Sequence, residues 1–186
     1  MSIPDRLKIK PVDENVVARM LELLPDIEEE LEAGGDAEAL LQQWHQLANH
    51  RYTTDAFLNY WKSTSEEDFV LTALNPEPTV DQELQFTEAC AVIDAFKTGE
   101  LSEYETDYYL NWLKTQFPES NISDLIFWPD EWFGDASLFR DPGGAFRPGS
   151  ELTSEQMVGY AMARCGRSLP GTPDDLVLPH PLPPTG

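Results

Sequence analysis

Large aromatic side chains and carboxylates are interspersed in one short stretch of the sequence. The stretch reads DLIFWPDEWFGD and contains Trp128 and Trp132 together with the acids Asp124, Asp130, Glu131 and Asp135. Tryptophan anchors protein interfaces because it buries a large area with few rotamers, and a nearby carboxylate can pair with a partner's arginine or lysine. The stretch is a candidate partner-binding site. The alternative is that Trp128 and Trp132 close over the protein's own core.

Two further groups of residues extend the candidate binding surface. The acidic run that contains Glu28, Glu29 and Glu32 could dock on a basic partner, or could simply be the solvated face of a helix. Tyr108 belongs to a second cluster of aromatic and acidic residues, over 104–112, that spans more than one helix face. One face of such a helix must pack, which leaves the other available for contact.

Residue patterns typical of catalysis or metal binding are missing from the sequence. It has no glycine-rich phosphate loop, no Gly-x-Ser-x-Gly turn and no Cys-x-x-Cys pair. His45 and His50 are five residues apart, roughly 140° around a helix, so they would not share a face. Cys90 falls on an apolar stripe, as a packed thiol does. We therefore expect no enzyme activity, no catalytic residue, no metal ligand and no cofactor.

The charge of the chain restricts its partners. The 186 residues include 34 Asp and Glu but 12 Lys and Arg, which gives a formal net charge of −22. Residues 11–139 hold 28 of those acids and only five of the bases. A potential this negative repels phosphate backbones and anionic lipids, so we expect no direct binding of nucleic acid or membranes and favour a basic protein partner. Two cysteines and the lack of an apolar N-terminal segment predict a cytoplasmic location.

Helical periodicity dominates the sequence and predicts the fold class. Apolar residues recur at three- and four-residue steps, for example at Met20, Leu24, Ile27 and Leu31, with Pro25 either kinking this helix or dividing it in two. Capping-box spacing predicts four more helix starts, at Ser63, Thr79, Ser102 and Thr153. The one convincing extended run is Leu125–Trp128. We therefore predict an all-α or mainly α, single-domain bundle of six to eight helices with one short extended segment.

The ends of the chain differ from its centre. Residues 1–12 are predicted to form an N-terminal arm, residues 13–167 the acidic helical domain, and residues 168–186 a proline-rich tail. Proline excludes a regular helix or a central strand from the tail. We expect the tail to lie against the domain through Leu176, Val177 and Leu178.

Two stretches of the sequence prompt a family resemblance. One is Asn121–Pro129, which follows a predicted helix, and the other is Glu151–Val158, which opens the last helix. With the acidic helical composition, this layout resembles that of bacterial immunity proteins, small cytoplasmic inhibitors encoded beside a secreted or contact-delivered toxin. The resemblance covers roughly residues 53–165. It implies one-to-one neutralisation of a cognate toxin by a monomeric inhibitor, and it carries over no catalytic residue.

Three other classes of function remain open at the level of sequence. An adaptor subunit of a larger assembly would also use exposed aromatic and acidic residues. A mimic of the nucleic-acid duplex would arrange its carboxylates in two ordered rows with few aromatics between them. An enzyme would bring perturbed carboxylates together around His45 or His50. Because many delivered toxins act on nucleic acids and are basic, a nuclease is the favoured partner.

Overall fold

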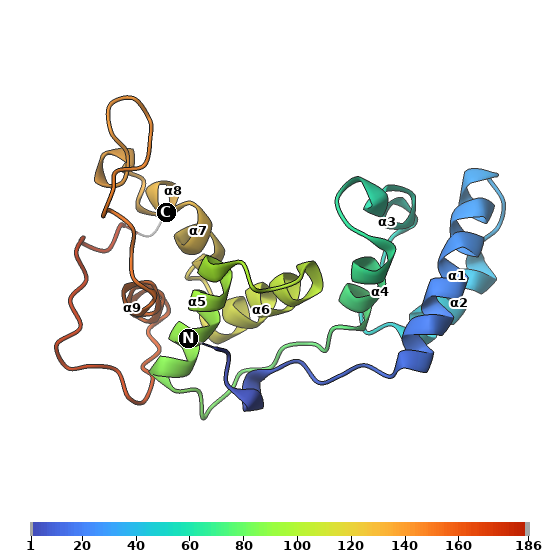
Figure 1. Ribbon diagram of the computed structural model, residues 1–186, viewed down its shortest axis with the longest axis horizontal. Coiled ribbons are helices and arrows are strands. Elements are labelled where there is room, and N and C mark those ends of the chain that lie inside the picture. The colour runs from blue at the N-terminus through green and yellow to red at the C-terminus, as the bar shows by residue number, and fades with distance from the viewer. Residues whose placement is uncertain (1, 185–186) are drawn as a thin grey trace. The chain divides into compact units, whose positions relative to one another are not determined.

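The computed structural model describes residues 2–184, and its regular structure is helical. Within this range the chain forms nine α-helices and three short 3₁₀ helices, η1–η3, and no β-strand. In chain order (Figure 1) the elements are η1 (Asp5–Leu7), α1 (Glu14–Glu32), α2 (Glu38–Leu47), α3 (Thr54–Asn59), η2 (Tyr60–Lys62), α4 (Glu66–Leu74), α5 (Phe86–Thr98), α6 (Glu103–Gln116), α7 (Ile122–Phe127), α8 (Pro129–Phe133), η3 (Ala136–Leu138) and α9 (Ser154–Cys165). The predicted all-α fold class is confirmed.

The helical domain contains two compact units. The α1–α4 unit comprises residues 8–77 and 101–108, and the α5–α9 unit comprises the described residues of 1–7, 78–100 and 109–186. Helix α6 contributes its first turns to one unit and the rest to the other. The predicted boundaries near residues 12 and 167 stay predictions.

Helix α1 continues through Pro25. The Asp13 carboxylate begins the helix by accepting a hydrogen bond from the backbone N–H of Asn15 at 2.9 Å. Met20 and Ile27, on the two sides of the proline, are both fully buried, while Pro25 itself is exposed. Burial of one apolar face over the whole length of α1 outweighs the backbone hydrogen bond that the proline removes.

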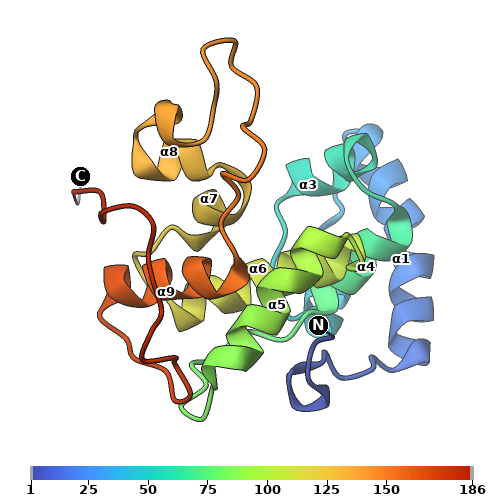
Figure 2. The same ribbon diagram turned by 60° about the vertical axis from the view of Figure 1, so that its left-hand side comes forward.

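Aromatic side chains form the core of the α1–α4 unit, whose helices α1, α3 and α4 are labelled in Figure 2. Trp44 meets Phe57 edge to face with ring centroids 5.1 Å apart, and its ring centroid lies 5.8 Å from that of Phe69. Tyr60 stacks on Phe69 at 4.5 Å, and Tyr52 lies 4.7 Å from the same ring. Trp44 is completely buried. This cluster supplies the hydrophobic stabilisation that lets short helices such as α3 persist.

In the α5–α9 unit, α5 and α9 pack against each other. Both helices begin with a reciprocal capping box, Gln85 with Glu88 in α5 and Thr153 with Gln156 in α9. Both also end at a glycine in the left-handed conformation, Gly99 after α5 and Gly166 after α9. Cys90 is buried on α5, and burial raises the pKa of its thiol to about 12, so the thiol is protonated at neutral pH.

Two of the four predicted helix starts are confirmed. Thr153 forms its capping box, and the Glu105 carboxylate accepts hydrogen bonds from the backbone N–H of Ser102, at 2.9 Å, and from its hydroxyl. The other two predictions are wrong. Helix α4 is capped by Ser65 rather than Ser63, because Ser63 closes η2. Helix α5 begins after Gln85, and Thr79 lies in the preceding loop, where its backbone carbonyl accepts a hydrogen bond from Gln116.

The predicted extended run, Leu125–Trp128, is wrong. Most of it lies in α7, which buries Ile122 and Leu125 on one face at helical spacing. The backbone carbonyl of Asn121 accepts hydrogen bonds from the N–H groups of Asp124 and Leu125 at 2.9 and 3.2 Å. A short apolar run cannot by itself distinguish a strand from a buried helix, so the tertiary contacts of Ile122 and Leu125 decided the structure here.

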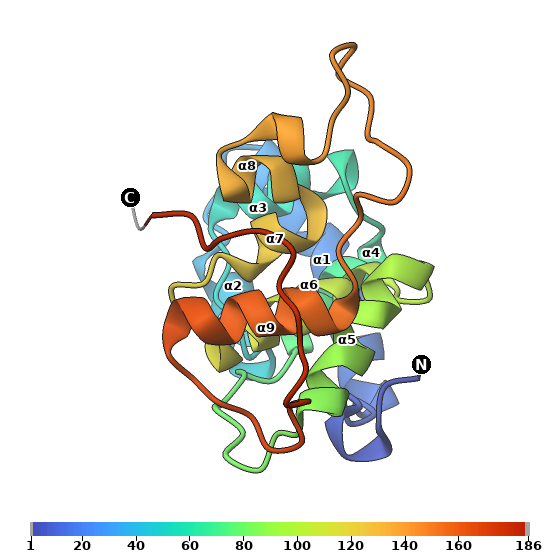
Figure 3. The same cartoon turned by 90° about the vertical axis from the view of Figure 1, so that its left-hand side faces the viewer.

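The C-terminal segment, residues 168–184, crosses α9 as an extended strap (Figure 3). A methyl group added at Gly159 would come within 2.8 Å of Leu176 and 2.9 Å of Leu178, so the missing side chain lets the strap approach. The Tyr160 hydroxyl donates to the backbone carbonyl of His180 and accepts from its N–H, both at 2.7 Å. The predicted packing of Val177 is wrong. Its side chain is 71% exposed because it points away between the two leucines.

Candidate protein-binding surface

The sequence stretch with alternating aromatics and acids folds as two short helices joined at Trp128. Its backbone N–H donates to the carbonyl of Asp124 at 2.7 Å, and its own carbonyl accepts from the N–H groups of Glu131 and Trp132 at 3.0 Å each. Pro129 follows as the first residue of α8, where a missing N–H has no cost. We call residues 121–135 the α7–α8 segment.

Two large aromatic side chains of the α7–α8 segment are exposed to solvent. Trp128 is 52% exposed and Phe127 is 43% exposed. Phe127 touches Phe96 of α5 edge to face, with ring centroids 6.0 Å apart. Because the backbone at Trp128 is held by hydrogen bonds on both sides, these two rings lie on a folded turn whose backbone loses little further entropy on binding.

Trp132, the second predicted anchor, is built into the protein. Its indole N–H donates to the backbone carbonyl of Ser120 at 2.7 Å. Its ring meets Tyr160 edge to face at 5.6 Å, and the Arg164 guanidinium lies 4.9 Å from its centroid. The two tryptophans therefore differ. Trp132 is half-buried and packs within the protein, whereas the side chain of Trp128 projects into solvent.

The four acids of the segment also separate into different environments. Asp124, Glu131 and Asp135 are exposed. Asp135 uses its carboxylate to accept hydrogen bonds from the hydroxyl and the N–H of Ser137 at 2.6 and 2.9 Å, and these bonds lower its pKa. Asp130 is buried, and the Arg140 guanidinium donates to it at 2.5 Å. Asp130 is therefore occupied within the protein, whereas Asp124 and Glu131 face solvent.

The Asp130–Arg140 pair fastens the loop that follows η3. The Arg140 guanidinium donates to the carbonyl of Gly144 at 3.0 Å and lies 4.0 Å from the ring centroid of Phe146. Arg140 and Phe146 also form an isolated β-bridge. Through these contacts one buried carboxylate holds the base of the loop over residues 140–146 against α8.

Stability should fall at acidic pH through Asp130. The hydrogen bond from Arg140 holds the pKa of Asp130 below the ordinary value of about 3.9, so the pair stabilises the folded protein above that pH and the contribution is lost as the pH falls through the lower folded-state pKa. In Asp130→Asn, the free energy of unfolding from denaturant curves should fall less between neutral and acidic pH than in the native protein. The same loss of stability at acidic pH in Asp130→Asn as in the native protein would contradict a role for the pair. Asp174→Asn, at an exposed position, is the control and should keep the native pH dependence.

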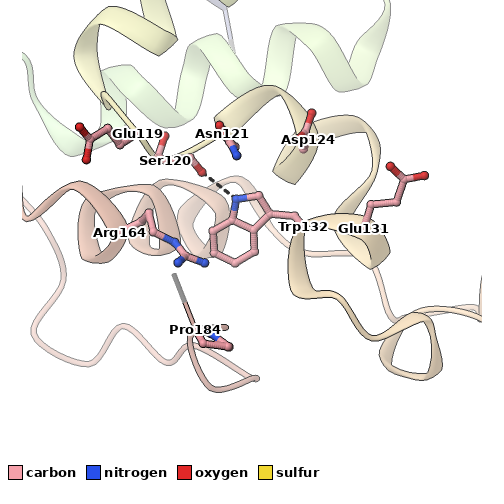
Figure 4. A pocket seen from close by; sticks show the side chains of 8 residues that line it. All are labelled: Glu119, Ser120, Asn121, Asp124, Glu131, Trp132, Arg164 and Pro184. Carbon is pink, nitrogen blue, oxygen red and sulfur yellow. Dashed lines mark hydrogen bonds between the residues drawn. The ribbon is translucent and has the colours of Figure 1, made fainter. Parts of the chain in front are cut away.

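A pocket opens beside Trp132, with a volume of about 350 Å³. Figure 4 shows Trp132 at its centre with Arg164 beside the ring. Its remaining lining residues are Glu119, Ser120, Asn121, Asp124, Glu131 and Pro184. Glu119 and Asn121 have φ angles of 61° and 49°, so two non-glycine residues adopt the left-handed conformation around the buried Ser120.

The acids predicted on α1, and Tyr108, belong to the α1–α4 unit. Glu29 and Glu32 are exposed, whereas Glu28 is half-buried and accepts a hydrogen bond from the Tyr60 hydroxyl at 3.4 Å. Burial raises the pKa of Glu28 above its ordinary value. Tyr108 is half-buried too, and burial raises the pKa of its phenol. Of these four residues, only Glu29 and Glu32 are exposed.

Sequence reasoning missed several residues of the site. Phe127 was not among the predicted partner-binding residues, yet it is exposed beside Trp128. Glu119 and Arg164 line the pocket but are distant from each other in sequence. No local pattern brings them together, because the contact depends on α9 packing beside the α7–α8 segment.

Residues 2–184 contain neither a metal-binding cluster nor a membrane-spanning helix. That range has no group of three or more His, Cys, Asp or Glu side chains suited to holding a metal ion. None of its helices has both the length and the apolar character needed to cross a membrane. His50 lies near Glu77, with Nδ1 3.3 Å from the carboxylate.

Comparison with protein-family models, curated proteins and solved structures finds no match for this chain. The assignment of a function therefore depends on the geometry of the α7–α8 segment, on the charge of the chain and on the resemblance noted from the sequence.

Proposed function

We propose that this protein is an inhibitory binding protein of the immunity type, which neutralises a cognate basic toxin domain in a one-to-one complex. The observation that supports this most is the pair of exposed rings, Phe127 and Trp128, on a hydrogen-bonded turn beside the solvated carboxylates of Asp124 and Glu131. A nuclease is the favoured toxin because it must be basic to bind its own substrate.

Charged and aromatic side chains would contribute differently to the formation of such a complex. A net charge of −22 attracts a basic domain over a long range and speeds association, an effect that weakens as salt is added. Affinity would come from burying Trp128 and Phe127, because large aromatic side chains dominate the binding free energy of most interfaces. The charge therefore sets the rate of encounter, and the rings set how long the complex lasts.

The exposed aromatic rings favour this proposal over the duplex mimic. A mimic needs ordered rows of carboxylates with few aromatic side chains among them. In the α7–α8 segment the exposed acids instead alternate with tryptophan and phenylalanine, and Asp130 is withdrawn into an internal ion pair.

A survival assay tests the proposed function. The toxin domain encoded by the neighbouring upstream reading frame would be expressed from an inducible promoter in a bacterial host, with and without this protein. We expect growth arrest without it and survival with it. Continued arrest despite a soluble, folded inhibitor would reject the pairing. A neighbouring frame that encodes no toxic product would reject the immunity class.

Trp128→Ala should weaken toxin binding by about 2 kcal/mol or more, roughly thirtyfold in the dissociation constant, because it removes a large anchor from a pre-formed turn. Stability should change little, since the side chain is already half in water. Isothermal titration calorimetry with the toxin domain measures the effect.

Trp61→Ala is the matched control for Trp128→Ala. Trp61 is 63% exposed, belongs to the α1–α4 unit and is absent from the proposed surface. Its replacement should leave affinity within a factor of about two. Equal losses in the two variants, or a loss only in Trp61→Ala, would place the binding surface elsewhere.

A further inference from the structure

The pocket beside Trp132 is lined by charges that do not neutralise one another. None of the carboxylates of Glu119, Asp124 and Glu131 has an ion pair with a described residue. Arg164 lies against the indole ring of Trp132, and within the described chain no carboxylate is at ion-pair distance from its guanidinium. Three acids and one arginine leave the lining with a net charge of −2.

The pocket has a rigid wall as well as a charge. The Trp132 ring cannot swing out without breaking its 2.7 Å hydrogen bond to Ser120 and its edge contacts with Phe133 and Tyr160. Ser120 is itself buried and donates from its hydroxyl to the carbonyl of Phe117 at 2.6 Å. The pocket volume of about 350 Å³ thus stands beside a fixed indole, in the size range of sites that enclose a side chain or small ligand.

The charge of the lining selects between two kinds of occupant. An anion would pair with Arg164 but would meet three carboxylates and the field of a strongly negative chain. A cation would meet the carboxylates, and Arg164 would oppose it with only one charge. A slender apolar stem could lie along the indole while its charged end reaches Asp124 or Glu131.

We propose that this pocket receives one lysine or arginine side chain of the protein partner. This inference depends on the proposed function for the partner, and it adds a specific contact next to the exposed rings of Phe127 and Trp128. The occupant inserts beside Trp132 and is held by Asp124 and Glu131, which line the same pocket as Glu119. Arg164 limits the affinity for that cation.

The pocket can be tested without the toxin. The probe is N-acetyl-arginine methylamide, added up to about 100 mM to ¹⁵N-labelled protein, because one side chain alone binds weakly. We expect a saturable shift of the Trp132 indole N–H resonance and none of the Trp61 resonance. The neutral citrulline analogue should shift neither. The double variant Asp124→Asn, Glu131→Gln should weaken probe binding about threefold to tenfold, and Asp174→Asn should not.

Replacement of Arg164 should change the affinity of the pocket for a cation and for an anion in opposite directions. Arg164→Gln should strengthen binding of the arginine probe, because it removes an opposing charge from the lining. Acetate that shifts Trp132 in the native protein but not in Arg164→Gln would identify an anion pocket and overturn the proposal. No response of Trp132 to the arginine probe would overturn it as well. Since Asp124 and Glu131 are exposed, their variants keep the test decisive if Arg164→Gln fails to fold.

The same variants separate this inference from the proposed function. If Trp128→Ala weakens toxin binding while Asp124→Asn with Glu131→Gln does not, the pocket inference fails and the proposed function stands. If the arginine probe binds as expected but no toxin from the neighbouring frame is neutralised, the pocket inference stands as a cation site and the proposed function fails.

Discussion

Replacement of Trp44 by alanine should lower the free energy of unfolding of the α1–α4 unit by about 3 to 5 kcal/mol, a range typical of large aromatic side chains removed from a core. Trp44 is completely buried, and its ring contacts both Phe57 and Phe69. Its loss would leave a cavity in the middle of the aromatic cluster. Chemical denaturation followed by circular dichroism measures the change.

Trp44→Phe distinguishes the loss of volume from the loss of the indole N–H. Within the described residues the Nε1 atom of Trp44 is buried without a hydrogen-bond partner, so phenylalanine would remove an unsatisfied donor while keeping most of the ring contacts. We expect Trp44→Phe to cost less than about half as much as Trp44→Ala. A loss in Trp44→Phe as large as in Trp44→Ala would mean that the N–H has a stabilising partner.

Gln116→Leu should destabilise the α5–α9 unit by about 2 to 4 kcal/mol, because Gln116 is buried and its replacement removes three part-buried hydrogen bonds at once. The side-chain amide of Gln116 donates to the carbonyl of Thr79 and accepts from the N–H of Asp81, both at 2.8 Å. Its oxygen also accepts from the Arg167 guanidinium at 3.0 Å. Gln116 thus fastens residues 79–81 and Arg167 to the end of α6.

Gln42→Leu is the control for Gln116→Leu. Gln42 is exposed on α2 and makes one side-chain hydrogen bond, to Glu38 at 3.3 Å, so its replacement should change stability by less than about 0.5 kcal/mol. Hydrogen exchange can localise the effect of Gln116→Leu. Faster exchange confined to a region other than residues 79–81 and the C-terminal end of α6 would contradict the role given to Gln116.

The helical fold was predictable from the sequence because amphipathic periodicity repeats over many residues. The apolar positions Met20, Leu24 and Ile27 all lie on the buried face of α1. Helix starts were less predictable. The Thr153 box formed as predicted, whereas Thr79 lies in a loop that Gln116 of α6 holds by hydrogen bonds to residues 79 and 81. A local capping pattern cannot show such long-range contacts.

The candidate site was predictable in location but not in detail. The sequence placed Trp128 and Asp124 in one stretch of acids and rings, and both are exposed. It could not show that Asp130 pairs with Arg140 or that Trp132 bonds to Ser120, because these partners are ten or more residues away. Whether a ring packs or projects depends on the turn at Pro129 and on the packing of α9, which are tertiary features.

Amide hydrogen exchange of the protein alone and in complex with its toxin domain tests the central claim most directly. If the α7–α8 segment is the docking surface, exchange should slow in the complex most strongly over residues 121–135, and the indole N–H of Trp128 should become protected as well. Protection confined to α1, or spread evenly over the described chain with Trp128 unchanged, would contradict the claim.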